Sequence, residues 1–332
     1  MEPIEFACPI CKGPLEQESK GYICARDDRS YPVTLGIPDF RPFPHEWVES
    51  DVEQAWTALL VTEYRNRSFA ELVDLYATLM PGMPADLAAM LRARFLGGVV
   101  HGQSCLAELQ HLGALPATRN FLDIGCGSGG FLVAASYVFQ SVVGLDISMP
   151  RLILAKKQLE DTGREAIVIW GCAESLPFVD NSFHVVVGSD VIEHVKEQVQ
   201  VMREAKRVMV SGGLLFLATP NRWSLTPEPH VNVWGVGFLP KAWRASYVWR
   251  ARNIPYVNVS LLNWFETRRL ILQTPFERWH IIAPTFPPEH TARLPAWARA
   301  AVPLYHALKE RLVLKWLVYL FGPLFHVICI KR

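Results

Sequence analysis

Short apolar runs alternate with amphipathic stretches along the chain from Phe121 to Pro220. The runs read FLDIG, SVVGLDI, AIVIWG, HVVVGSD and GLLFLATP, and the stretches between them repeat apolar residues at helical spacing. Strands that alternate with helices in this way build a parallel sheet that helices cover on both faces. The sequence therefore predicts an α/β fold with a doubly wound sheet.

The first run leads into a glycine-rich segment, DIGCGSGG, at residues 123–130. Gly125, Gly127 and Gly130 match the G-x-G-x-x-G pattern of dinucleotide sites. A carboxylate at Asp123 would repel a pyrophosphate, however, because pyrophosphates bind to the N–H groups at helix N-termini. It suits a ligand with a cationic end, such as an ammonium or a sulfonium group. The glycines would let the backbone approach that ligand closely, since a Cβ atom would obstruct it.

A second carboxylate, Asp146, ends the next predicted strand, which begins at Val142. At the carboxyl end of a parallel strand, Asp146 is suitably placed to accept hydrogen bonds from both hydroxyls of a ribose. The alternative is that Asp146 caps the helix that begins near Met149. The glycine-rich segment upstream favours the ribose.

These motifs, in this order, resemble the core of the class I S-adenosylmethionine-dependent methyltransferases (type 11-like). The resemblance rests on LDIGCGSGG, VVGLDIS, GCAESLPFVDNSFHVVVGSDVIEHV and REAKRVMVSGGLLFLATPN, and it covers residues 119–221. It implies a seven-stranded Rossmann-like sheet and S-adenosyl-L-methionine as the cofactor. The cofactor contacts that it implies are Asp123, Gly125, Gly127, Gly129, Asp146, Ile147, Ala173, Glu174 and Ser189.

One departure from the family pattern concerns the adenine. Cys172 occupies the place where the family usually has an aspartate that reaches the adenine amino group. That contact would then fall to the backbone around Ala173 or to Glu174. Further along, the resemblance implies a helix and the sixth strand within residues 263–282, and the seventh strand within residues 324–332.

Polar residues after the fourth predicted strand border the active cleft, because ligands of such sheets sit at the carboxyl ends of the strands. Asp190, Glu193 and His194 follow the spacing D-x-x-E-H, which is similar to the E-x-x-E-H metal site of ubiquinone-pathway O-methyltransferases. We favour His194 as a general base over a divalent metal, since imidazole titrates near neutral pH. The alternative is that Glu193 and His194 have only a structural role and cap and pack the next helix. His230, after the fifth strand, is the second catalytic candidate, and its alternative is an ordinary loop histidine.

Three of the seven cysteines lie close together near the N-terminus, as Cys8-x-x-Cys11 followed by Cys24. This spacing is typical of a zinc ribbon or knuckle. The region resembles the small zinc-ribbon-like domain that precedes some methyltransferases, including ribosomal-RNA guanine methyltransferases. The place just after Cys24, where a fourth Cys or His is expected, holds Ala25-Arg26-Asp27-Asp28, so either Asp27 or Asp28 completes the site, or the domain folds without metal. The predicted ligands are Cys8, Cys11, Cys24 and Asp28.

Charge is distributed unevenly along the chain, although its formal net value is +1. Residues 222–332 contain 15 Lys and Arg against 5 Asp and Glu, and they hold 8 of the 11 tryptophans. A basic, aromatic region suits an anionic small substrate, an anionic membrane surface or RNA. RNA is the weakest of the three candidates. Residues 1–45 carry 5 basic and 7 acidic side chains, and this net negative charge would repel the phosphates of RNA.

Four segments follow from these patterns. They are a zinc-ribbon-like module (1–45), a helical lead-in or lid (46–118), a cofactor-binding core (119–221) and a substrate-covering insertion with the last strands (222–332). An odd number of cysteines and an N-terminus without an apolar run indicate a cytoplasmic protein with peripheral membrane contact at most. Leu312–Ile330 is apolar, but Lys315, His326 and Gly322-Pro323 favour a helix, a break and a strand over a membrane span.

The predicted reaction is methyl transfer from S-adenosylmethionine to an oxygen or carbon of a small acceptor, lipophilic or anionic. One alternative is methylation of an RNA base. A second alternative is a non-catalytic protein that binds the cofactor or associates with a membrane.

Overall fold

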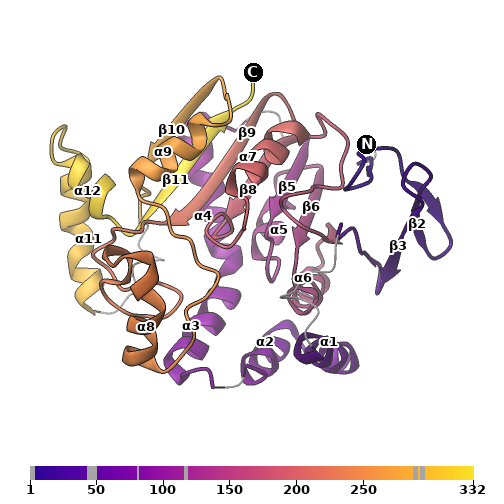
Figure 1. Ribbon diagram of the computed structural model, residues 1–332, viewed down its shortest axis with the longest axis horizontal. Coiled ribbons are helices and arrows are strands. Elements are labelled where there is room, and N and C mark those ends of the chain that lie inside the picture. Colours follow the sequence, from indigo (N-terminus) through magenta and orange to yellow (C-terminus); the bar gives the residue numbers. More distant parts are fainter. Residues whose placement is uncertain (1–3, 43–50, 81, 116–118, 287–290, 292–295) are drawn as a thin grey trace.

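The computed structural model describes residues 4–42, 51–80, 82–115, 119–286, 291 and 296–332. Its centre is a seven-stranded sheet with the order β10-β11-β9-β8-β5-β6-β7 (Figure 1). The strands are β5 (Asn120–Ile124), β6 (Ser141–Asp146), β7 (Ile167–Trp170), β8 (Phe183–Ser189), β9 (Met209–Pro220), β10 (Arg278–Ile282) and β11 (Leu324–Ile330). The α/β doubly wound sheet predicted from the sequence is confirmed, including its sixth and seventh strands.

The strand order creates the place for a ligand. The chain runs outward through β5, β6 and β7, then returns to the other side of β5 for β8 and β9, and all five are parallel. β11 lies antiparallel between β9 and β10. The order therefore switches between β5 and β8, and crevices for ligands form at the carboxyl ends of strands at such a point.

Helices cover both faces of the sheet. Leu72 and Leu152 pack on one face with Val185, while Met202 and Leu270 pack on the other face with Val186. Successive valines of β8 thus enter opposite cores, as the pleat of a strand requires. The helices around the first face are α2 (Phe69–Thr78), α4 (Gly98–His111), α5 (Gly130–Ala135) and α6 (Met149–Asp161), and those on the second are α7 (Gln198–Val208) and α9 (Trp264–Leu272).

The lead-in helices reach the carboxyl edge of the sheet. They comprise α2 and α4 together with α1 (Asp51–Glu63) and α3 (Ala85–Leu96). Ser148, which follows β6, donates a hydrogen bond to Glu53 of α1 (2.7 Å), and Ser189 lies 3.3 Å from the His101 ring of α4. The predicted boundaries at 45/46 and 118/119 fall in or beside ranges 43–50 and 116–118, outside the described residues.

The N-terminal module is a separate four-stranded antiparallel sheet, β1 (Glu16–Glu18), β2 (Gly21–Cys24), β3 (Arg29–Thr34) and β4 (Ile37–Pro38). The chain just after β4 lies against the edge strand β7, where the backbone N–H of Phe40 donates to the carbonyl of Trp170 (2.8 Å). Lys12 forms an ion pair with Glu204 of α7 (2.8 Å). The module therefore covers one edge of the large sheet and is joined to it by polar contacts and by apolar packing, because Phe40 belongs to the same buried core as Phe178.

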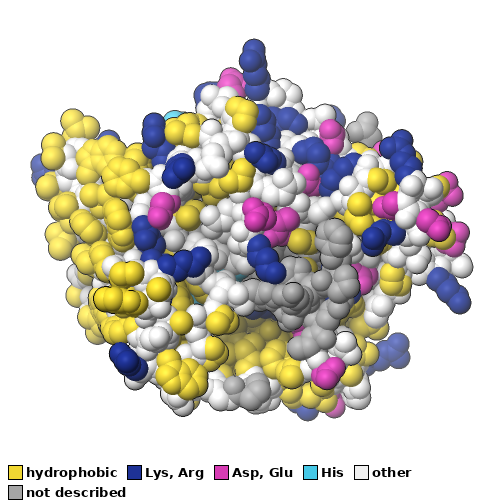
Figure 2. Space-filling view, in the orientation of Figure 1, with side chains coloured by type: hydrophobic (Ala, Val, Ile, Leu, Met, Phe, Trp, Pro, Cys, Tyr) yellow, Lys and Arg dark blue, Asp and Glu magenta, His cyan; other side chains and the backbone are white. Residues whose placement is uncertain are grey.

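The last third adds η1 (Val236–Phe238), α8 (Lys241–Arg252), α11 (Ala296–Lys309) and α12 (Lys315–Phe321). Residues around η1 and α8 form a small core of their own, with Val231, Val236 and Val248. α11 and α12 lie at the opposite end of the molecule from the N-terminal module (Figure 1), and hydrophobic side chains gather over this end (Figure 2). No helix in the described part of the chain is both long and apolar enough to cross a membrane.

Candidate active site

The glycine-rich segment forms the turn between β5 and α5. Gly125, Gly127 and Gly129 all have positive φ angles (73°, 51° and 83°), which glycine adopts without strain. A Cβ atom on Gly125 would meet Val191 at 2.7 Å, and one on Gly129 would meet Ala155 at 2.9 Å. A Cβ on Gly127 would meet no protein atom within 4 Å. Of the three glycines, only Gly127 therefore faces open space where a ligand fits, and the other two allow close packing.

Two buried carboxylates lie beside this turn. Asp146 accepts hydrogen bonds from the backbone N–H groups of Gly127 and Ser148, both at 2.8 Å. Burial, and then the nearby Asp146, raise the pKa of Asp123 well above its usual range. Neither Asp123 nor Asp146 forms an ion pair with a described Lys or Arg. A ligand with a cationic end would supply the missing positive charge, so the residues present fit S-adenosylmethionine.

The residues implied for the adenine lie after β6 and β7. The Ile147 carbonyl accepts a hydrogen bond from the Trp170 indole (2.8 Å), and Ala173 is buried. The thiol of Cys172 donates to the carboxylate of Glu174 (2.8 Å). Burial, followed by Glu174, raises the pKa of Cys172 to about 12, so the thiol remains a neutral donor. Cys172 thus fixes the Glu174 side chain in place.

The two histidines predicted from the sequence lie side by side. The rings of His194 and His230 are 4.7 Å apart in an edge-to-face arrangement. One ring nitrogen from each histidine and one carboxylate oxygen of the buried Glu193 lie within 4.8 Å of one another. Thr219 donates to Oε2 of Glu193 (3.1 Å), whereas Oε1 of Glu193 and Nε2 of His230 are buried without a hydrogen-bond partner. Such orphaned atoms mark a polar site that a ligand group or a water completes.

Glu228, which belongs to none of the sequence motifs, orients His230. Its Oε1 lies 2.5 Å from Nδ1 of His230, and its Oε2 accepts from the backbone N–H groups of His230 (2.9 Å) and Val231 (3.0 Å). The carboxylate therefore holds the ring with its proton on Nδ1 and leaves Nε2 free to accept one. The only sequence signal was the position of Glu228 two residues before a candidate histidine.

The protonation of the two rings differs. Desolvation opposes the charged form of His230, but the carboxylates of Glu228 and Glu193 outweigh it and raise the pKa of His230. His194 keeps an exposed face, but desolvation of its ring, and then the charge of His230, lower its pKa to about 4. Burial and Asp190 raise the pKa of Glu193. This pattern favours His230 over His194 as the proton acceptor near neutral pH.

Asp190 does not join this cluster. The residue has a φ of 53°, and its carboxylate accepts a hydrogen bond from Arg94 of α3 (2.5 Å). The triple of Asp190, Glu193 and His194 considered from the sequence is therefore not assembled, and the structure brings His230 to the other two instead. Glu193, His194 and His230 are close enough to surround a cation as well as a proton.

The N-terminal cysteines converge as predicted, but the fourth partner is corrected. The Sγ of Cys8 lies 2.9 Å from Asp27, the Sγ atoms of Cys11 and Cys24 are 3.4 Å apart, and all four side chains offer atoms within 4.8 Å of one another. Asp28 is exposed with a φ of 53° and is not in this group, because the turn after Cys24 brings Asp27 inward instead.

The arrangement of this cluster suits a metal. Backbone N–H groups of Ile10 and Cys11 point at the sulfur of Cys8, and that of Gly13 points at the sulfur of Cys11. The hydrogen bond from Gly13 lowers the pKa of Cys11. Three thiols and a carboxylate form a set of four that zinc accepts, and N–H groups directed at sulfur stabilise thiolates. The residues present therefore fit zinc.

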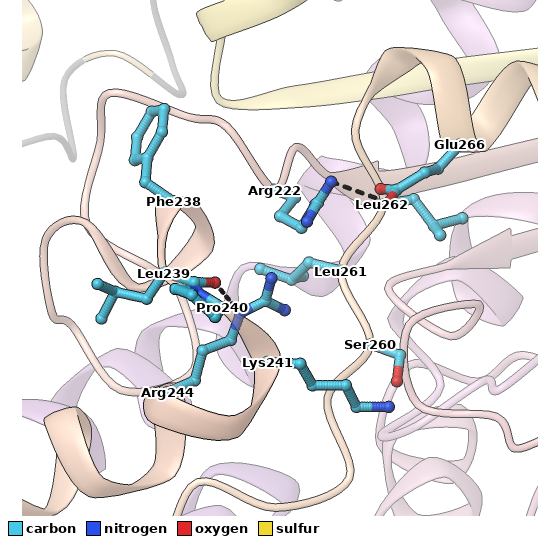
Figure 3. Close-up of a pocket in the computed structure, with 10 residues that line it drawn as sticks. All are labelled: Arg222, Phe238, Leu239, Pro240, Lys241, Arg244, Ser260, Leu261, Leu262 and Glu266. Atoms are coloured by element: carbon cyan, nitrogen blue, oxygen red, sulfur yellow. Dashed lines mark hydrogen bonds and ion pairs between the residues drawn. The ribbon is translucent and has the colours of Figure 1, made fainter.

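Two cavities lie along α8, and one of them reaches His194. The first, of about 530 Å³, is lined by Arg222, Phe238, Leu239, Pro240, Lys241, Arg244, Ser260, Leu261, Leu262 and Glu266 (Figure 3). The second, of about 390 Å³, includes His194 and Lys196 in its wall. Lys241, Arg244 and Ser260 line both cavities, so the two cavities adjoin along α8 and the segment that precedes α9.

Known proteins resemble parts of this chain. Residues 122–217 match the family described as methyltransferase domain, and residues 6–36 match the family described as Trm112p-like protein. Ajmaline N-methyltransferase of Rauvolfia serpentina is 28% identical over 176 residues, which are 48% of this chain and 60% of that protein. Ubiquinone biosynthesis O-methyltransferase of Brucella ovis is 32% identical over 102 residues, 31% of this chain and 41% of that protein.

Among solved structures, this chain is similar to an S-adenosylmethionine-dependent methyltransferase of Thermotoga maritima. The match covers 72% of this chain and 93% of that one, with a TM-score of 0.46 and 22% sequence identity. The chain spans about half the length of the curated relatives that it matches. These relatives include both N- and O-methyltransferases, so they do not define the acceptor.

Proposed function

We propose that this chain, whose residues 122–217 are a class I S-adenosylmethionine-dependent methyltransferase domain, methylates an oxygen or carbon of a small acceptor. The observation that carries the proposal is the pair of Glu228 and His230, 2.5 Å apart, with a buried and unpartnered Nε2 at the ligand edge of the sheet. An acceptor oxygen or carbon loses a proton on methylation, and this pair is built to take one.

The glycine turn would hold the methyl donor. Gly127 leaves room for it, Asp146 would accept hydrogen bonds from its ribose, and Asp123 would face its cationic end. When bound, S-adenosylmethionine supplies a methyl group on a positively charged sulfur. The adjoining loop after β8 contacts this turn, because Val191 lies against Gly125. Donor and acceptor sites are thus built on neighbouring strands, and alignment of the two reactants lowers the barrier.

His230 would remove the proton. The carboxylate of Glu228 keeps Nδ1 protonated and stabilises the imidazolium that forms when Nε2 accepts a proton. His194 remains neutral and packs edge-to-face against that ring. The lead-in helices α1, α3 and α4 border the same edge through Glu53, Arg94 and His101, and they would exclude water from the site.

The direct test is transfer of labelled methyl groups. The wild-type chain is incubated with methyl-labelled S-adenosylmethionine and an extract separated into small molecules, lipid and RNA. We expect label in the small-molecule or lipid fraction. Label confined to RNA would contradict the proposed acceptor class, and cofactor binding without transfer to any fraction would contradict catalysis.

We also propose that the N-terminal cluster binds one zinc ion through Cys8, Cys11, Cys24 and Asp27. An Asp27→Ala variant is expected to bind zinc at least about tenfold more weakly, because it removes the oxygen ligand. Asp28→Ala is the matched control, and its affinity is expected to equal that of the wild type. Chelator competition followed by metal analysis measures both. A wild-type chain that folds without metal, or equal losses in both variants, would refute the site.

A third proposal concerns the end of the molecule that contains α11 and α12. We define the apolar end as Leu304, Leu312, Val313, Trp316 and Leu317, which are 62%, 79%, 75%, 45% and 46% exposed. Residues 296–321 also contain four basic side chains and only one acidic one. Exposed leucine and tryptophan beside basic residues are typical of surfaces that insert into an anionic lipid headgroup layer. We therefore propose peripheral contact with an anionic membrane here.

Vesicle sedimentation tests this contact. The wild-type chain is expected to bind vesicles with about 30% phosphatidylglycerol more strongly than pure phosphatidylcholine vesicles, and this preference should weaken as salt increases. Leu312→Asp combined with Val313→Asp should abolish binding, whereas Val52→Asp, an exposed change on α1 at the far side, should not. Concentration-dependent self-association that the double variant removes, without vesicle binding, would assign this end to a second copy instead.

A further inference from the structure

Arg244 is a buried cation on the inner side of α8. It is only 7% exposed, and it is one of two buried residues in that helix. Its Nε donates to the carbonyl of Leu239 (3.0 Å), but among the described residues no carboxylate forms an ion pair with it. Desolvation, and then the charge of Arg222, lower the pKa of Arg244. A buried guanidinium in this state is destabilising unless an anion joins it.

The nearest carboxylate is already engaged. Glu266 pairs with Arg222 (2.8 Å), and its other oxygen caps α9 by accepting from the backbone N–H of Asn263 (2.9 Å). Figure 3 shows the Arg222–Glu266 pair on one side of the cavity and the Arg244 guanidinium on the other, directed into the space between them. The protein itself therefore leaves the positive charge of Arg244 uncompensated.

Two further cations share the space with Arg244. Lys241 lines both cavities and Lys196 lines the second, and neither forms an ion pair with a described carboxylate. In Figure 3 the side chain of Lys241 extends toward the hydroxyl of Ser260. Apart from Glu266, no acidic residue is among the lining residues of either cavity. The cavities thus present three unpaired cations and a hydroxyl donor, which is the chemistry of an anion site.

The second cavity connects this charge to the histidine pair. Its wall contains His194. The segment that carries Ser260 is hydrogen-bonded to the loop after β8, because the N–H of Ser260 donates to the carbonyl of Glu193 (2.8 Å). His194 also contacts the carbonyl of Asn258 (3.4 Å). A small molecule held at Arg244 would therefore extend toward His194, whose ring lies 4.7 Å from that of His230.

We infer that the methyl acceptor carries an anionic group, a phosphate or a carboxylate, and that Arg244 and Lys241 bind this group while the methylated end faces His230. The inference rests on the proposed methyl transfer and specifies its substrate class. Arg244 supplies the buried charge, and Lys241 and Ser260 supply hydrogen bonds from the side that is open to solvent.

Anion titrations test the site without knowledge of the acceptor. Inorganic phosphate and acetate are titrated separately into the full chain, with and without S-adenosylhomocysteine, by calorimetry and by thermal melting. We expect at least one of the two anions to bind and to raise the melting temperature. Arg244→Met is expected to weaken that binding at least about tenfold, because a charged hydrogen-bonding partner is lost. The anion that binds the wild type more tightly shows whether the anionic group of the acceptor is a phosphate or a carboxylate.

The stability of the variant separates a binding residue from a structural one. Because Arg244→Met replaces an uncompensated buried charge by an apolar chain of similar length, its anion-free melting temperature should equal or exceed that of the wild type. Arg250→Met, an exposed change on the same helix, is the control and should retain anion binding.

Three results would overturn the inference: no binding of either anion to the wild type, equal loss in Arg250→Met, or undiminished binding in Arg244→Met. S-adenosylmethionine affinity, measured in parallel, keeps the two claims apart. A wild type that binds the cofactor but neither anion refutes only the anion site, whereas a wild type that does not bind the cofactor refutes the proposed function.

Discussion

A Gly127→Ala variant is expected to lose roughly 10- to 100-fold in affinity for S-adenosylmethionine while the protein remains folded. The new Cβ would meet no protein atom within 4 Å, so it causes no clash within the chain. It would instead occupy the open space that we assign to the cofactor. The positive φ of 51° adds backbone strain of about 1 kcal/mol, which reduces stability but not the room for the ligand.

Gly163→Ala provides the matched control for this strain. Gly163 also has a positive φ, 61°, and a Cβ there also meets nothing within 4 Å, but it follows the C-terminal end of α6, away from the ligand edge. Both variants should lose similar stability in thermal melts, and only Gly127→Ala should lose cofactor affinity in calorimetry. Equal affinities in the two variants would contradict the placement of the cofactor at Gly127.

A His230→Gln variant is expected to transfer methyl groups roughly 10²- to 10⁴-fold more slowly while it binds S-adenosylmethionine like the wild type. The reason is that we assign proton removal to His230, which follows β9 and is not part of the glycine turn. Single-turnover transfer of label measures the rate, and calorimetry measures the affinity. His280→Gln, which changes an exposed histidine of β10, is the control and should leave both unchanged.

Glu228→Gln should be nearly as damaging, although it removes only a charge. The backbone N–H groups of His230 and Val231 would keep the amide oxygen at the position of Oε2, so the amide nitrogen would face Nδ1 of His230. An N–H donor there forces the ring proton onto Nε2, and the ring can no longer accept a proton from substrate. A variant that combines Glu228→Gln with His230→Gln should then transfer methyl groups no more slowly than the slower of the two single variants. Additive losses would show that the two residues act separately.

The pH dependence of transfer follows from the same pair. His230 must be neutral to accept a proton, so activity should rise with pH through its pKa and be lost below it. Desolvation and Arg94 oppose the charged ring, but the carboxylates of Glu228 and Glu193 outweigh them and raise this pKa. The acidic limb of the rate profile should therefore lie above the usual range of a histidine. A limb near pH 4, the pKa of His194, would transfer the role to His194.

The sequence predicted the sheet well because each strand carries its own signal. A helix, a break at Gly322-Pro323 and a strand were expected within the apolar run Leu312–Ile330, and β11 begins just after that break and ends at Ile330. The contacts between segments carried no such signal. Nothing in the order of residues showed that Arg94 would engage Asp190, or that Glu228 would lie on the ring of His230. The choice between Asp27 and Asp28 depended on one left-handed residue in a turn.

The histidine pair illustrates the same limit at the site. His194 and His230 were both predicted, from two different loops, but their 4.7 Å separation arises from the paired strands that precede them. Their relative roles depend on desolvation and on nearby carboxylates, which only the folded chain defines. Sequence patterns could thus name the candidates but could not rank them.

The attachment of the N-terminal module to β7 and α7 has a consequence for protein synthesis. Lys12 leaves the ribosome long before Glu204, its partner 192 residues later, and Phe40 waits for Trp170. At roughly 5–20 residues per second, Lys12 is synthesised about ten to forty seconds before Glu204. During that interval the three N-terminal thiols are without the packing of the core. Early capture of a metal ion would give this stretch of nascent chain a fold of its own until the rest arrives.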